Sequence, residues 1–294
     1  MVTTMTDTHN LNSSPRKVAA IQINSLADIE HNLQQIETLL GEAQQQGVRL
    51  ALIPEMFATL DGKQYPAIAA DDALYQRIAG WGKRFNLWLI AGAYPLPCPP
   101  DADGKRDPRV RSACLVFDDQ GELQARYDKI HLFDVDVDDA QGSYRESDHF
   151  APGDQPVVVD TPVGKVGLAI CYDLRFPQLF MQLRAQGAEI ISLPAAFTYT
   201  TGAAHWQPLL RARAIEQQCY VIAANQCGWH DDPDQPQRRQ TWGHSQIIDP
   251  WGEVLSEASD QPGLVVATLE PQQQADIRQR MPVFQHQRLN PRVR

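Results

Sequence analysis

Three residues of types that perform nucleophilic catalysis each stand within two positions of the end of a predicted strand. They are Glu55 after 50–53, Lys129 after 123–127 and Cys171 after 165–170. In α/β proteins the carboxyl ends of strands direct side chains and free backbone N–H groups into a cleft. A thiol at a strand-to-helix turn is a good nucleophile because the helix N-terminus favours negative charge. We therefore expect the three side chains to meet in one pocket.

These residue types fit the demands of amide hydrolysis. An amide carbon is a poor electrophile, so catalysis needs a strong nucleophile, a proton donor for the leaving nitrogen and stabilisation of the oxyanion. Cys171 is predicted to attack and form a thioester, and Glu55 to act as general base and general acid in turn. Lys129 is predicted to offset negative charge on the thiolate and the oxyanion, with the Tyr172 backbone N–H as a second oxyanion donor.

On these three motifs and on segment 197–206, the chain resembles the nitrilase superfamily of carbon-nitrogen hydrolases. Members of the superfamily use a Glu, a Lys and a Cys in this chain order, and the resemblance extends from 17 to 288. It implies an α-β-β-α sandwich, in which two mixed sheets are flanked by helix layers. It also implies that Glu146 has a supporting role, orienting the lysine and the attacking water.

Within the superfamily, the chain is most similar to the deaminated glutathione amidase branch. Segments 209–216, 217–228 and 282–288 carry this similarity. Members of that branch hydrolyse the side-chain amide of deaminated glutathione and release 2-oxoglutarate and Cys-Gly. The sister branch, ω-amidase, cleaves 2-oxoglutaramate and 2-oxosuccinamate, and the sequence leaves this alternative open.

Both branches act on small-molecule 2-oxo acid amides, for which the sequence offers a carboxylate-binding group. Arg175 follows Cys171 by four residues at a predicted helix start, so its guanidinium can hold a carboxylate through two parallel hydrogen bonds. Four further residues on the predicted loop 195–202 are expected to form the pocket wall and to supply hydroxyl donors. They are Phe197, Tyr199, Thr200 and Thr201.

Two other interpretations are open at this point. Cysteine is paired with histidine in many thiol hydrolases, and His131 shares a face with Lys129 if the segment is extended. His205 and His244 are further candidates for the base. Alternatively, the protein is a non-catalytic binding member of the fold or a thiol sensor, because a fold does not guarantee an activity.

Composition narrows the class of protein. The 294 residues are 43% hydrophobic and contain no Gly/Ser-rich linker, which favours one domain over 15–280. The net charge is −10 with scattered Lys and Arg, which argues against nucleic acid or an anionic membrane as partner. The five cysteines show neither C-x-x-C nor metal-type spacing, so we expect no disulfide, no metal and no cofactor, in a cytoplasmic protein.

The two ends of the chain differ from its body. Residues 1–14 lack the basic and apolar regions of a signal peptide and are predicted to be a disordered tail. Residues 281–294 are rich in Arg and Pro. The family resemblance implies that this C-terminal tail packs at an interface of a homo-oligomer, a dimer or larger.

Strand and helix patterns alternate along the body, as expected for an α/β protein. Predicted strands cover 17–23, 50–53, 87–91, 111–117, 123–127, 157–160, 165–170, 189–193, 219–225, 245–249, 252–256 and 263–269. Predicted helices cover 26–46, 74–85, 177–186, 206–218 and 271–280. Continuous apolar strands such as 188–193 indicate sheets that are covered on both faces.

Overall fold

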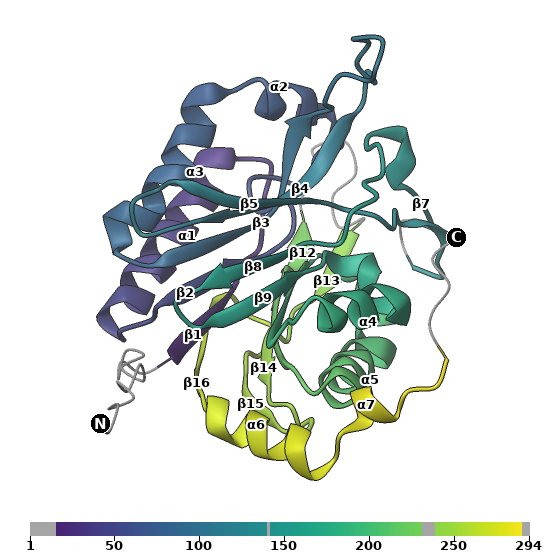
Figure 1. Cartoon of the computed structure of the whole chain (residues 1–294). Helices are drawn as coiled ribbons and strands as arrows, with labels where there is room; N and C mark the ends of the chain where they lie inside the picture. The colour runs from purple at the N-terminus through teal and green to yellow at the C-terminus, as the bar shows by residue number, and fades with distance from the viewer. Residues whose placement is uncertain (1–15, 140–141, 231–238, 290–294) are drawn as a thin grey trace, which may run out of the picture.

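The computed structural model describes residues 16–139, 142–230 and 239–289 and contains two six-stranded mixed sheets (Figure 1). The first sheet has the order β16-β1-β2-β3-β4-β5. Its strands are β1 (Arg16–Gln22), β2 (Leu50–Ile53), β3 (Trp88–Pro97), β4 (Val110–Phe117), β5 (Leu123–Asp128) and β16 (Gly263–Leu269). Strands β1, β2 and β3 run parallel, and the remaining pairs are antiparallel.

The second sheet has the order β15-β14-β11-β10-β9-β8. Its strands are β8 (Val158–Thr161), β9 (Gly164–Leu168), β10 (Ile190–Ala195), β11 (Tyr220–Asn225), β14 (Gln246–Ile248) and β15 (Val254–Glu257). Two short ribbons complete the β structure: β6 (Asp134–Asp136) with β7 (Ser143–Arg145), and β12 (Cys227–His230) with β13 (Arg239–Trp242).

Helices cover the outer faces of both sheets (Figure 1). On the first sheet these are α1 (Ile29–Gln45) and α3 (Asp72–Phe85), with the short α2 (Tyr65–Ala69) at one end. On the second sheet they are α4 (Pro177–Ala185) and α5 (Tyr199–Gln217). The chain ends in α6 (Pro271–Arg280) and α7 (Val283–His286). The predicted α-β-β-α sandwich is therefore confirmed.

Strand β1 illustrates how the sequence builds these layers. Val18 and Ala20 belong to the apolar core shared with the second sheet, whereas Ala19 and Ile21 pack in the core beneath α1. This alternation follows from the two-residue repeat of a strand. Helix α1 begins where the Asp28 carboxylate accepts the His31 N–H at 3.1 Å, which satisfies one of the free donors of the first turn.

The main departure from the predicted elements is α5, which begins at Tyr199 rather than at Trp206. The loop predicted over 195–202 is therefore wrong beyond Thr198. Gly202 and the neighbouring threonines disfavour a helix by intrinsic propensity. In the structure, however, Gly202 is the point where α5 lies closest to Trp242: a β-carbon there would stand 2.2 Å from Trp242 Cβ. Tertiary packing outweighs local propensity at this position.

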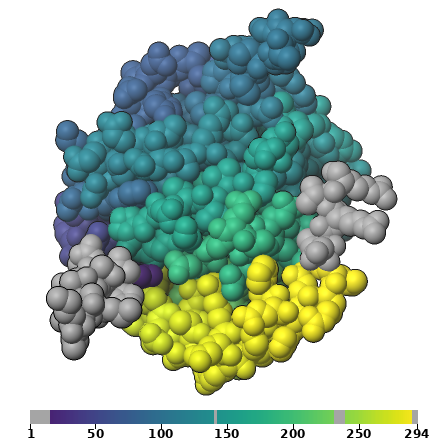
Figure 2. All heavy atoms as spheres, in the orientation of Figure 1, coloured from purple at the N-terminus to yellow at the C-terminus, as the bar shows by residue number. Residues whose placement is uncertain are grey.

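The C-terminal elements line one edge of the molecule. Figure 2 shows this part of the chain, in yellow, as a continuous outer band. Val283, Phe284 and Leu289 are exposed on it. The role of 281–294 at an oligomer interface stays a prediction. The predicted tail 1–14 lies outside the described residues, and no helix within them is long and apolar enough to cross a membrane.

Gly92 provides a test of the packing between the sheets. A β-carbon at this position of β3 would stand 2.2 Å from the Ile53 carbonyl oxygen and 2.5 Å from Pro194 Cβ. We expect Gly92→Ala to lower the free energy of unfolding by about 1–3 kcal/mol, because backbone cannot yield as a flexible side chain does. Urea denaturation measures this effect.

The matched control is Gly80→Ala on the exposed side of α3, where a β-carbon meets nothing within 4 Å. Alanine there is expected to raise the free energy of unfolding by about 0.5–1 kcal/mol, since glycine is a poor residue for a helix interior. Equal effects of the two substitutions would contradict the packing inferred for Gly92.

Candidate active site

The Lys129 ammonium is buried between two carboxylates. Its Nζ lies 2.7 Å from Glu55 Oε1 and 2.8 Å and 2.9 Å from the two oxygens of Glu146. The Lys129 and Glu55 residues are only 2% and 5% exposed. Burial by itself lowers the pKa of Lys129, but the charges of Glu146 and Glu55 outweigh it and hold the pKa well above its ordinary value. Lys129 is therefore a permanent cation.

The surrounding backbone fixes both carboxylates. Glu55 follows β2, and its Oε2 accepts the Ala196 N–H at 2.9 Å. Gln226, just after β11, donates from Nε2 to the Glu55 carbonyl at 3.0 Å. Glu146 begins a short 3-10 turn, and its Oε2 accepts the Phe133 N–H at 2.6 Å. Because Glu55 follows a strand of the first sheet while Ala196 and Gln226 follow strands of the second, the position of this acid depends on both sheets.

Cys171 begins the 3-10 turn 171–175 in the left-handed backbone region, with φ of 47°. Such a conformation costs a non-glycine residue about 1–2 kcal/mol, so neighbouring contacts must hold it. Asp173 accepts the Ile170 N–H at 2.8 Å, and Arg213 of α5 donates to the Leu174 carbonyl at 2.9 and 3.1 Å. These bonds hold the turn that presents the thiol.

The surroundings of Cys171 favour the protonated thiol over the thiolate. Burial raises the pKa of the thiol well above its ordinary value, and the charge of Glu55 adds to this rise. The Lys129 charge and the Ala196 N–H act in the opposite direction but do not outweigh them. The thiol is therefore protonated at neutral pH, and its attack on a substrate requires a base at hand.

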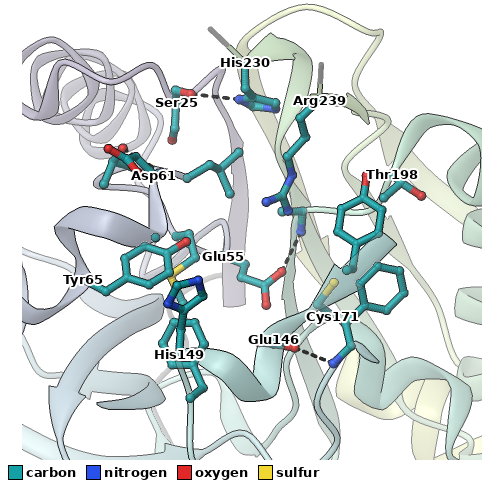
Figure 3. A pocket seen from close by; sticks show the side chains of 18 of the residues that line it. Ser25, Glu55, Asp61, Tyr65, Glu146, His149, Cys171, Thr198, His230 and Arg239 are labelled. Carbon is teal, nitrogen blue, oxygen red and sulfur yellow. Dashed lines mark hydrogen bonds between the residues drawn. The ribbon is translucent and has the colours of Figure 1, made fainter. Parts of the chain in front are cut away.

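The candidate residues open onto a cavity of about 600 Å³ (Figure 3). Eight of the residues expected from the sequence line it: Glu55, Lys129, Glu146, Cys171, Tyr172, Arg175, Phe197 and Thr201. Tyr199 and Thr200 do not line the cavity, because they belong to the first turn of α5 and are exposed to solvent. The Tyr199 ring packs against Trp242, with centroids 5.1 Å apart.

Two donors at the cavity are available to a ligand. The Tyr172 N–H, at the start of the turn, has no acceptor among the described residues. The Arg175 guanidinium lies over the Phe197 ring at 5.3 Å and 3.2 Å from His205 Nδ1, and no carboxylate in the described part of the chain pairs with it. The cavity can thus hold an oxyanion next to the thiol and a carboxylate further out.

The three histidines considered as bases lie outside the cavity lining. His131 Nδ1 lies 2.6 Å from the buried Asp173 carboxylate, and its ring stacks on Phe176 at 3.8 Å. His205 contacts Arg175, and His244 lies 3.2 Å from the Glu257 carboxylate. These contacts give each histidine a structural role, so the geometry favours Glu55 as the base.

Several residues that line the cavity were not expected from the sequence, among them Ser25, Asp61, Tyr65, His149, His230 and Arg239. They come from loops, α2 and the β12–β13 ribbon, and no local motif marks them. Cys98, Cys114, Cys219 and Cys227 are buried away from the cavity. In the ranges described above, no group of three or more His, Cys, Asp or Glu could hold a metal ion.

The comparison with known families shows to which family the chain belongs. Residues 17–279 match the family model described as carbon-nitrogen hydrolase. The chain belongs to the carbon-nitrogen hydrolase family. The resemblance to the nitrilase superfamily and its deaminated glutathione amidase branch is thereby confirmed. This hydrolase is 44% identical over 275 residues to the deaminated glutathione amidase of Yersinia enterocolitica, and the match covers 92% of each chain.

Solved structures give the same result for the fold. The NitFhit protein of C. elegans superimposes with a TM-score of 0.82 at 35% identity, over 93% of the hydrolase and 65% of that longer chain. A glutamate-to-glutamine variant of the amidase from Nesterenkonia sp. AN1 matches with a TM-score of 0.73 at 26% identity, over 94% and 97% of the two chains. That structure shows covalent addition of the acetamide moiety of fluoroacetamide at the active site cysteine.

The buried cluster of charges predicts a pH-dependent loss of stability. Burial raises the pKa of Glu146, and the Lys129 charge opposes this rise. In Lys129→Met the pKa of Glu146 in the folded state rises further, so protonation stabilises the fold at low pH and this stabilisation is lost as pH increases. We expect a loss of about 3–5 kcal/mol near pH 7.5 and a smaller loss near pH 5, measured by urea denaturation.

Lys165→Met is the matched control, because Lys165 pairs with Asp160 at the exposed surface. It is expected to change the free energy of unfolding by less than about 1 kcal/mol at either pH. A loss in Lys129→Met that does not depend on pH would contradict the view that its two carboxylates are left uncompensated.

Proposed function

We propose that this hydrolase cleaves an amide bond through a thioester on Cys171, with Glu55 and Lys129 as its partners. The observation that supports the proposal most strongly is the 2.7 Å contact between Lys129 and Glu55 at the floor of the cavity that Cys171 also lines. A permanent cation and a carboxylate beside a protonated thiol provide the charge stabilisation and the proton acceptor that the reaction needs.

The proposed reaction has two halves. In the first, Cys171 Sγ attacks the carbonyl carbon while its proton passes to Glu55. The Tyr172 N–H and the Lys129 ammonium stabilise the oxyanion of the tetrahedral intermediate. Glu55 then gives the proton to the leaving nitrogen, the C–N bond breaks, and the amine departs from the thioester.

In the second half, water attacks the thioester and gives a proton to Glu55. Glu146 orients Lys129 and the attacking water. The C–S bond breaks, the acid product leaves, and the proton on Glu55 returns to the sulfur. The net reaction adds one water to the amide and releases one acid and one amine.

We further propose deaminated glutathione as the substrate, with 2-oxoglutarate and Cys-Gly as products. The relative from Yersinia enterocolitica that carries this name supports the proposal. In the acyl half, Arg175 would bind the carboxylate beside the 2-oxo group, and the Phe197 ring and the Thr201 hydroxyl would form the adjoining wall.

The role of Glu55 is tested by Glu55→Gln. Because glutamine can neither accept nor donate the proton, kcat is expected to fall by about 10²–10⁴-fold, measured by release of 2-oxoglutarate. Glu122→Gln, at an exposed turn, is the control and keeps the activity of the parent. An unimpaired Glu55→Gln enzyme would return the role of base to a histidine.

The substrate is tested by comparing kcat/KM for deaminated glutathione with kcat/KM for 2-oxoglutaramate. The two amides share their acyl half, so the comparison isolates the leaving group. We expect deaminated glutathione to be preferred by about tenfold or more, since a bound leaving group contributes transition-state binding. A preference of that size for 2-oxoglutaramate would instead identify the protein as an ω-amidase.

A further inference from the structure

The cavity extends well beyond the residues that cleave the bond. In Figure 3, Glu55 lies between Cys171 on one side and Tyr65 on the other, and Arg239 extends toward Glu55 from β13. Ser25 and His230 also line the cavity, and together with Tyr65 and Arg239 they form what we call the distant wall. The proposed reaction steps use none of these four residues. A volume of about 600 Å³ suits a ligand much larger than a primary amide.

Tyr65 supplies a polar group to this wall without a protein partner. The residue is 5% exposed, and its ring packs on Phe150 at 5.0 Å and edge-on against His149 at 6.0 Å. Its hydroxyl forms no hydrogen bond with any described residue, although it belongs to a side chain that lines the cavity. The hydroxyl is not among the fully buried polar atoms, so it is accessible from the cavity and free to bond a ligand there.

Arg239 supplies a positive charge to the distant wall. Its guanidinium forms no ion pair with the described residues, and its Nε is buried without a hydrogen-bond partner. The guanidinium carbon lies 5.8 Å from the centroid of the Tyr144 ring. Arg239 is also the strongest of the charges that act on Tyr65: burial raises the pKa of the phenol, and Arg239 opposes this rise. Arg239 and Tyr65 both line the cavity and point into it, so one anion bound there can contact both side chains (Figure 3).

The neighbouring titratable groups among the described residues form no ion pair with this cation. Burial lowers the pKa of His230 to about 3, and its ring nitrogens contact the Ser25 carbonyl at 2.8 Å and the Thr241 hydroxyl at 2.7 Å. His230 is thus neutral and fully bonded. The Asp61 carboxylate accepts from the Lys63 N–H at 3.0 Å and from Gln64 at 3.2 Å. Lys63, Arg145 and Asp148 also line the cavity, but Arg239 is the cation beside Tyr65, and no described carboxylate forms an ion pair with it.

The position of Glu55 assigns this wall to one half of the substrate. Glu55 must protonate the leaving nitrogen, so the leaving group lies next to Glu55, while the acyl half reaches toward Arg175. We propose that Tyr65 and Arg239 bind a carboxylate on the leaving group, so that the enzyme selects amides whose amine half ends in an acid. This inference rests on the proposed function and assigns the specificity for the leaving group to two residues.

The test compares three substrates that share the 2-oxoglutaryl half. They are deaminated glutathione, its C-terminal carboxamide, which lacks only the charge, and 2-oxoglutaramate, which has no dipeptide. For the parent enzyme we expect kcat/KM to be about 10- to 100-fold higher for the acid than for the carboxamide, because a hydrogen bond to a charged carboxylate contributes more to substrate binding than one to a neutral amide. A ratio near one would overturn the inference.

Variants of Arg239 and Tyr65 then show whether these two residues produce the ratio of kcat/KM for the acid to kcat/KM for the carboxamide. Arg239→Gln is expected to bring the ratio of acid to carboxamide close to one, Arg239→Lys to keep part of it, and Tyr65→Phe to lower it by about 5- to 10-fold. Arg280→Gln on α6 and Tyr75→Phe on α3 are matched controls away from the cavity and keep the parent ratio. Equal losses for both substrates in Arg239→Gln and Tyr65→Phe, with the ratio unchanged, would mean that these residues are only structural and would overturn the inference.

The third substrate separates this inference from the proposed function. Hydrolysis of 2-oxoglutaramate, with no hydrolysis of deaminated glutathione or its carboxamide, would refute deaminated glutathione as substrate and the carboxylate subsite with it. Equally fast hydrolysis of deaminated glutathione and its carboxamide would leave the proposed function intact and refute the carboxylate subsite alone.

Discussion

The pairing of the Lys129 ammonium with Glu55 and Glu146 is the interaction on which the rest of the site depends. Three charges are removed from water, and they remain stable together because each carboxylate also accepts a backbone N–H, from Ala196 and from Phe133. The same arrangement keeps a cation beside the thiol without making the thiol a resting thiolate. In the proposed reaction, proton transfer to the carboxylate is therefore coupled to nucleophilic attack by the thiol.

The sandwich supports the site by bringing buried hydrogen-bonding side chains to it from distant parts of the chain. Gln226 bonds the Glu55 carbonyl, Asn225 accepts the Phe197 N–H at 3.0 Å, and Arg213 bonds the carbonyl of the cysteine turn. These three buried residues lie in segments 209–216 and 217–228, whose similarity to one amidase branch is visible in the sequence. That similarity therefore concerns the support of the site as well as its chemistry.

The parts of the fold and of the site that local sequence patterns encode can be predicted from the sequence. Glu55, Lys129 and Cys171 each follow a strand, so their convergence can be expected from the geometry of α/β sheets. Tyr199 and Thr200 were misplaced because packing on Trp242 extends α5 against local propensity. Tyr65 and Arg239 could not be predicted, since they belong to α2 and β13, which are far apart in the sequence and line the same cavity only in the folded chain.

In the proposed reaction, a carboxylate, an ammonium and a thiol act together to form a thioester. The most direct measurement is mass spectrometry of peptides from enzyme quenched in acid during turnover of deaminated glutathione. We expect a 2-oxoglutaryl adduct on the peptide that contains Cys171, absent before substrate is added. Rapid turnover with no acyl adduct on that peptide at any quench time, or an adduct on another cysteine, would contradict it.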